Sequence, residues 1–229
     1  MRSQVNISGW PLMVLSLVFG FGFYQLFQIF TPSSKSFVTV KGVAEQEIKA
    51  DYGVWNIYID LFGASMPVIQ AQKEQAMKEI QHFLIEQGFS EKDFTLVGIN
   101  INPSYDRYAF RGNLNYKIVT NKVDLIEAAS QKANSLYEKN VYLNMNSWGK
   151  QYYFIDVQKI KPELVKEALR SAQKAGENFA QLSNLKLGKI KKADQGVVRI
   201  LSYDRTESSE SVVKIARLVS TIDYFLENP

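Results

Sequence analysis

The chain has 229 residues, of which 46% are hydrophobic and 22% are charged, and its net charge is +4. These values are typical of a globular protein with one large or two small domains, and they exclude a wholly disordered or fibrous chain. The absence of cysteine excludes disulfides and thiol chemistry, and the single histidine, His82, excludes a metal site built from several histidines.

The chain begins with a long apolar segment. No charged residue lies between Arg2 and Lys35, and the 21 residues from Trp10 to Phe30 are mostly large and apolar, enough to cross a bilayer core. We expect a transmembrane signal anchor at residues 10–31, which would contact the lipid bilayer, after a short segment (1–9) and before a linker (32–36). A cleaved signal peptide and a soluble hydrophobic helix are the alternatives. The bulky residues at the exit, where a cleavage site needs small ones, favour the anchor.

Charge after this segment is nearly balanced. Only Arg2 of the 27 basic residues precedes Pro32, so 26 basic residues face 23 acidic ones, and we expect no nucleic-acid partner. The positive residues that flank residues 10–31 leave the membrane orientation undetermined. A dense basic run is interpreted as a solvated turn, with contact to anionic lipid as the alternative. This run consists of Lys186, Lys189, Lys191 and Lys192.

Periodicity predicts the elements that follow. Alternating residues predict strands at 37–43 and 54–62, joined into a hairpin by the polar stretch from Asp51 to Gly53. A helix is predicted from Pro67 to a C-terminal cap at Gly88. The remaining predicted elements are strands at 94–102 and 110–120, a helix at 122–139, strands at 141–146 and 152–157, a helix at 162–184, and strands at 189–193, 197–203 and 212–226.

This order, ββαββαββαβββ, interleaves helices with strand pairs. It predicts an α+β fold over residues 37–229, with helices packed on a mostly antiparallel sheet. The alanine-rich middle of the longest helix predicts close packing against a sheet or a neighbouring helix. The last strand, from Val212 to Leu226, is long, and we expect it to be an edge strand that is either covered or used for pairing with another chain.

Several motifs in this order resemble the SIMPL-domain family. Members begin with a V-x-G-x-G strand followed by P-D-x-A, and residues 38–44 (VTVKGVA) and 50–53 (ADYG) fill these places. Here Ala44, Ala50 and Gly53 replace the family residues. A helix-ending glycine, K-D and P-x-Y follow, and then an alanine-rich helix that enters L-G-K-I at 187–190. The main matching positions are Gly42, Asp51, Gly88, Asp93, Pro103 and Gly188.

The resemblance covers roughly residues 37–226 and implies an exported envelope protein, of a kind that forms ring-like or channel-like oligomers and has no established catalytic residues. We therefore expect a membrane-anchored, non-enzymatic protein of the bacterial inner membrane. It would cross the membrane once, and its soluble domain, in the periplasm or outside the cell, would form a closed homo-oligomer. Envelope organisation and stress tolerance are the roles considered. The alternative is a membrane-tethered module that binds a small molecule or a glycan.

No P-loop, dinucleotide fingerprint or G-x-S-x-G elbow is present, so we expect no catalytic residue, metal or cofactor. Asp51 is interpreted as a turn residue whose side chain accepts backbone N–H bonds. Aromatic residues at two turns are interpreted as core residues, interface anchors or ligand platforms. They are Tyr105, Tyr108, Phe110, Trp148, Tyr152 and Tyr153.

Overall fold

The computed structural model describes residues 36–105, 107–144 and 149–229, so the predicted anchor and Trp148 lie outside the described residues. None of the helices within these ranges has the length and apolar character needed to cross a membrane. The strands are β1 (Phe37–Lys49), β2 (Tyr52–Gly63), β3 (Phe94–Pro103), β4 (Phe110–Thr120), β5 (Tyr142–Leu143), β6 (Gly149–Tyr153), β7 (Lys186–Asp194), β8 (Arg199–Ser202) and β9 (Val213–Glu227). The helices are α2 (Met66–Glu86), α3 (Val123–Lys132), the 3-10 helix η1 (Ala133–Lys139) and α4 (Val157–Leu182).

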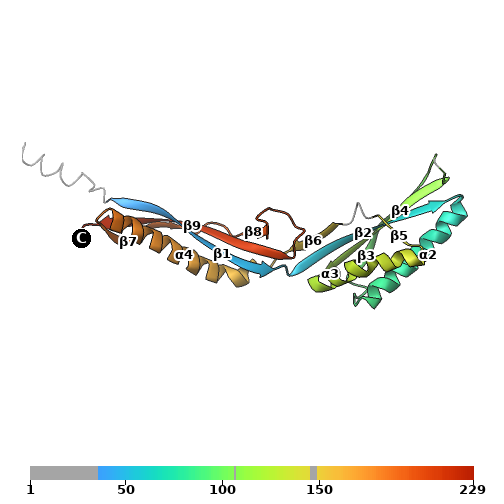
Figure 1. Cartoon of the computed structure of the whole chain (residues 1–229), viewed down its shortest axis with the longest axis horizontal. Coiled ribbons are helices and arrows are strands. Elements are labelled where there is room, and N and C mark those ends of the chain that lie inside the picture. The colour runs from blue at the N-terminus through green and yellow to red at the C-terminus, as the bar shows by residue number, and fades with distance from the viewer. Residues whose placement is uncertain (1–35, 106, 145–148) are drawn as a thin grey trace, which may run out of the picture.

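The predicted order of elements and the α+β class are confirmed, but the strands form two antiparallel sheets rather than one. One sheet has the order β1-β9-β7, with β8 also paired to β9, and the other has the order β3-β4-β2-β5, with β6 also paired to β2. We call the first sheet with α4 the terminal body. The second sheet with α2, α3 and η1 is the inserted body, because residues 52–153 are inserted between β1 and α4. Figure 1 shows the two bodies end to end in an elongated molecule.

The predicted hairpin at residues 37–62 is wrong. β1 pairs with β9 over its whole length and β2 pairs with β4, so the chain passes nearly straight from one sheet into the other (Figure 1). Backbone bonds to distant segments hold this passage open: the N–H of Ala50 donates to the carbonyl of Val212, and that of Asp51 donates to Tyr153. Gly53 is therefore not a turn residue. It lies in β2, where a Cβ would sit 2.6 Å from the Cδ1 of Ile126.

Close approach of α4 to β1 builds the terminal body. After Leu164, the buried stripe of α4 consists of alanines and one glycine, which confirms the predicted close packing. A Cβ on Gly42 of β1 would lie 1.9 Å from the carbonyl oxygen of Ala168. β9 lies between β1 and β7, so the expectation that the last strand is an edge is wrong. The basic run is also not a turn, because its four lysines belong to β7.

The inserted body buries one face of its sheet under helices. Trp55, Ile57, Ile59 and Leu61 alternate along β2 and are fully buried with residues of α2 and α3. α2 ends where predicted: Gly88 adopts a φ of +95°, its N–H donates to Ile85, and that of Phe89 donates to Leu84. This pair of bonds satisfies the last helical carbonyls with a glycine in the conformation that other residues avoid.

Two boundaries differ from prediction. The helix predicted at 122–139 is split into α3 and the tighter η1, which ends at Asn140 with a left-handed φ of 59°. α4 begins at Val157 and contains Pro162 inside it, whereas a strand to 157 and a helix from Pro162 were predicted. The carboxylate of Asp51 accepts the N–H groups of Ile155 and Asp156, which turns the chain out of β6 early.

Candidate functional site

The predicted aromatic residues do not form one site. Tyr105 is fully exposed between β3 and β4, and Tyr108 and Phe110 are half-buried close by. Phe110 lies opposite Gly63 at one end of β2, and Tyr153 lies opposite Tyr52 at the other. At about 3.3 Å per residue, β2 separates the two groups by roughly 36 Å. We therefore treat the β3–β4 tip and the junction between the bodies separately.

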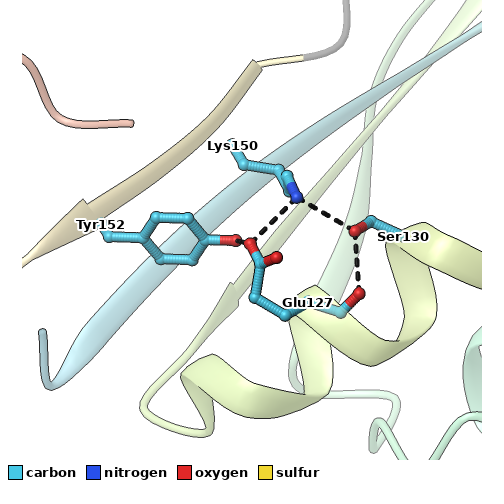
Figure 2. Close-up of polar contacts among 4 residues, drawn as sticks. All are labelled: Glu127, Ser130, Lys150 and Tyr152. Atoms are coloured by element: carbon cyan, nitrogen blue, oxygen red, sulfur yellow. Dashed lines mark hydrogen bonds and ion pairs between the residues drawn. The ribbon is translucent and has the colours of Figure 1, made fainter. Parts of the chain in front are cut away.

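Tyr152 is buried at the junction, where it joins β6 to α3 (Figure 2). Its hydroxyl donates to a carboxylate oxygen of Glu127, and Lys150 Nζ lies 2.9 Å from the same oxygen. Lys150 also donates to Ser130 Oγ at 3.1 Å, and Ser130 Oγ donates to the carbonyl of Glu127. The network therefore links the strand before α4 to the helix that covers the inserted sheet.

The electrostatics of this network suit a structural connection. Burial raises the pKa of Tyr152, and the neighbouring Glu127 carboxylate raises it further. Burial alone would raise the pKa of Glu127, but hydrogen bonds from Tyr152 and Lys150 and the charge of Lys150 lower it overall. The phenol thus stays protonated and the carboxylate ionised around neutral pH. Because the two pKa values are shifted in opposite directions, Tyr152 remains the donor and Glu127 the acceptor. Such a pair does not suit proton exchange near pH 7.

Asp51 makes the second set of structural contacts at the junction. Its Oδ1 accepts the N–H of Ile155 at 2.8 Å, and its Oδ2 accepts that of Asp156 at 3.1 Å. The expected acceptance of backbone N–H bonds is therefore confirmed, but the expected hairpin turn is wrong, because β1 and β2 do not pair and the donors are 104 and 105 residues away. Asp51 holds the start of α4 against the β1–β2 passage.

The other family-motif positions also shape the backbone. Asp93 Oδ2 accepts the N–H and hydroxyl of Ser90 at 2.8 and 2.9 Å, which closes the turn before β3. Pro103 ends β3 opposite Phe110. Gly188 lies at an irregularity of β7, where a Cβ would be 2.6 Å from Glu227 Oε1. The motif positions therefore lie in both bodies and at the junction, and they do not meet in one cleft.

Asparagines gather on the face of the inserted sheet opposite its buried face, a feature that the sequence analysis did not single out. Asn100 of β3 lies opposite Asn113 of β4, which lies opposite Asp60 of β2. Asn102 and Asn144 flank this row, at the end of β3 and after β5. A groove of about 300 Å³ runs over these residues, and we call it the amide groove. Its lining residues are Asp60, Phe62, Asn100, Asn102, Arg111, Gly112, Asn113 and Asn144.

Aromatic rings stand at one end of the amide groove. The ring of Phe62, which lines the groove, lies 5.2 Å from that of Tyr108 and 6.1 Å from that of Tyr142. The guanidinium of Arg111 lies over the Phe62 ring at 5.3 Å. Tyr108, one of the predicted candidates, thus belongs to an aromatic cluster whose other members sequence reasoning missed.

A larger groove, of about 1000 Å³, lies between α2 and the start of β3. We call it the α2–β3 groove. Ile85, Phe94 and Leu96 supply its apolar wall, and the exposed His82 also lines it. Within residues 36–105, 107–144 and 149–229, no set of three histidine or acidic side chains is placed to hold a metal ion.

The fold and its motif positions define a two-sheet α+β protein in which Gly42 lets α4 approach β1 closely and Asp51 holds the passage between the bodies. The model of the SIMPL family, described as a protein of unknown function (DUF541), matches residues 38–215. Because this match runs from β1 into β9 and covers well over half of the chain, the protein belongs to the SIMPL family. No curated protein matches the chain.

Proposed function

We propose that this protein is a membrane-anchored, non-enzymatic component of the bacterial envelope whose soluble domain assembles into a closed, ring-like or channel-like homo-oligomer. The anchor is the apolar segment 10–31, retained in the inner membrane, and the domain lies in the periplasm or outside the cell. The observation that carries the assembly is the open, uncharged edge of β3.

The position of β1 supports an anchor that holds the soluble domain in one orientation relative to the membrane. The linker 32–36 spans at most about 17 Å, so the start of β1 lies near the membrane surface. Phe37, the first residue of β1, lies opposite Phe225, near the end of β9. The end of the terminal body that is remote from the inserted body therefore faces the bilayer. β1 and β2 follow one another over roughly 80 Å of extended chain. The inserted body therefore extends away from the membrane.

The two sheets differ in how their edges are protected. β1, which pairs only with β9 among the described strands, carries Lys41, Glu45 and Glu47 on its exposed face, and such charges discourage pairing. Within the part of the chain that the structure describes, β3 pairs only with β4, and it has no charged residue in its ten positions. Val97 and Ile99 of β3 are exposed. An uncharged edge with exposed apolar residues is a template for another chain.

Two different patches beside β3 suit head-to-tail contact. The exposed Tyr105 projects beyond the end of β3, whereas the α2–β3 groove lies at its beginning. If the tip of one protomer occupies the groove of the next, the contact is heterologous and closes into a ring when the rotation permits. Tyrosine is a residue type enriched at such interfaces.

The assembly is tested by light scattering on the full-length protein in detergent, across a wide concentration range. Val97→Lys and Tyr105→Ser are expected to reduce the assembly to smaller species. The matched control is Val68→Lys on α2, because Val68 is 52% exposed and Val97 is 55% exposed. A monomeric wild type, or an assembly that withstands both changes at β3, would contradict the proposal.

The amide groove favours a second candidate function, a membrane-tethered module that binds a small molecule or a glycan. The two functions are compatible, because the groove lies on the face of the sheet and the proposed contact uses its edge. A monomer whose melting temperature rises with ligand would favour the binding module alone.

A further inference from the structure

We infer that the amide groove is a binding site for an uncharged saccharide. The carboxamides of β3 and β4 form hydrogen bonds with its hydroxyl groups, and the Phe62 ring packs against one apolar face of a sugar ring. The inference deepens the second candidate function and does not depend on self-assembly, because every residue that it uses belongs to one chain.

The residue types in the groove are unusual for a sheet. Asparagine is depleted in strands, yet β3 and β4 carry it at neighbouring outward positions, Asn100, Asn102 and Asn113. Within the groove, Asn102 donates to Asn100 at 3.0 Å and Asn144 donates to Asp60 at 3.2 Å. Asn113, at the centre, is exposed, and its carboxamide makes no hydrogen bond with the side chain or backbone of another described residue. These side chains therefore have hydrogen-bonding capacity that the fold does not use.

The chemistry of carboxamides selects the ligand. Each carboxamide presents two N–H donors and one carbonyl acceptor, and a hydroxyl group both donates and accepts. A row of amides on adjacent strands thus matches the row of hydroxyls on a sugar ring. A ligand that only accepts, such as a phosphate, would leave the carbonyl oxygens unpaired in the contact, which is costly.

Charge favours an uncharged ligand. The groove contains one acidic residue, Asp60, and one basic residue, Arg111, so their charges cancel. Asp60 is half-buried and already accepts the amide of Asn144, and Arg111 lies over the Phe62 ring. Neither charge sign dominates the site, as it would in a site for an anion or a cation.

The aromatic residues supply the remaining contact. A sugar ring has an apolar face of C–H groups, which an aromatic ring can cover while amides bind the hydroxyls at its rim. Phe62 lines the groove, and Tyr108 and Tyr142 pack around it at ring distances of 5.2 and 6.1 Å. A volume of about 300 Å³ is at the small end of ligand sites, which suits a short stretch of saccharide.

The groove is less suited to a second copy of this chain. The centre of a stable protein interface is depleted of charged residues and enriched in apolar ones, whereas half of the residues that line this groove are asparagines and two more are charged, one of each sign. The exposed apolar residues Val97 and Ile99 lie instead along the edge of the same sheet. Saccharide and self-assembly thus use different surfaces of the inserted body.

The test is isothermal titration calorimetry of the full-length protein, held in a detergent without a sugar head group so that the detergent does not compete. The probes are three neutral oligosaccharides, namely chitotriose with its N-acetyl groups, cellotriose and maltotriose. We expect saturable heat with at least one of them. Asn113→Ala and Phe62→Leu should each weaken that binding by about fivefold to tenfold, as expected for the loss of one hydrogen bond or one ring contact.

The matched control is Asn134→Ala, which removes another exposed carboxamide, from η1 and outside the groove. It should bind as the wild type does. Two results would overturn the inference: no saturable heat with any probe, or unchanged affinity in both groove variants. Light scattering on the same samples reports assembly separately, so failure of one proposal leaves the other measurable.

Discussion

Replacement of Gly42 by alanine tests the packing of the terminal body most directly. A Cβ at this position would lie 1.9 Å from the carbonyl oxygen of Ala168 and 2.6 Å from the backbone nitrogen of Ala172. Ordinary contact begins at 3.4 Å, so β1 and α4 would have to separate by about 1.5 Å. Both obstructing atoms belong to the main chain of a helix, and no side-chain rotation can relieve the overlap.

The cost follows from this separation. Overpacking of a core costs about 1–3 kcal/mol, and we expect Gly42→Ala at the upper limit, about 3 kcal/mol, because a whole strand–helix contact must open. For a chain of this size, about 2–4 °C of melting temperature is lost per kcal/mol, so the terminal body should melt roughly 6–12 °C earlier.

The assay is thermal unfolding of the full-length protein, followed by circular dichroism. Gly98→Ala is the matched control, because a Cβ on Gly98 would meet nothing within 4 Å. The control should change the melting temperature by only a degree or two, since exposed substitutions usually stay within about 0.5 kcal/mol. If Gly42→Ala melts together with Gly98→Ala, then α4 does not approach β1 as closely as described.

Four further changes test the junction and one helix end. Asp51→Ala removes a charged acceptor from two N–H groups and should cost about 2 kcal/mol, seen as faster amide hydrogen exchange at the start of α4 but not within α2. Tyr152→Phe should cost about 1 kcal/mol in urea unfolding, and no change would contradict the network with Glu127. The lowered pKa of Glu127 stabilises the fold above its unfolded pKa of about 4.3, and this contribution is lost as pH falls through the folded value. The melting temperature of Glu127→Gln should therefore fall less than that of the wild type between pH 6 and pH 3, when thermal unfolding is measured at each pH. Gly88→Ala places a side chain at a φ of +95° and should cost about 1 kcal/mol by calorimetry, and a wild-type melting temperature would speak against the left-handed cap.

The order of elements was predictable because its signals are local. A strand shows its period of two, and a helix its period of 3.6, within a single segment. Pairing is not local: the alternation of β1 and β2 is the same whether they form a hairpin or enter different sheets. Here the contacts that accompany the passage are distant in sequence: β1 pairs with β9, and the partners of Asp51, Ile155 and Asp156, are more than a hundred residues away.

The same distinction applies to the candidate sites. The sequence places these tyrosines near turns, but it does not show that Tyr152 is buried whereas Tyr105 is exposed. The sequence also shows Asn100 and Asn102 two residues apart, a spacing that places both on the same face of a predicted strand. Only the register that sets Asn100 opposite Asn113, and Asn113 opposite Asp60, turns separate asparagines into one groove.

The pairing of the first strand with the last has a consequence for how the protein is made. Every strand of the inserted sheet comes from residues 52–153, so that body has all its strand partners while the chain is still being synthesised. β1 emerges earlier but finds β9 only when residues 213–227 follow it, and α4 likewise waits for the sheet that it covers. The terminal body is therefore the last to fold, and until then β1 remains an unpaired strand that nascent neighbours or chaperones can reach.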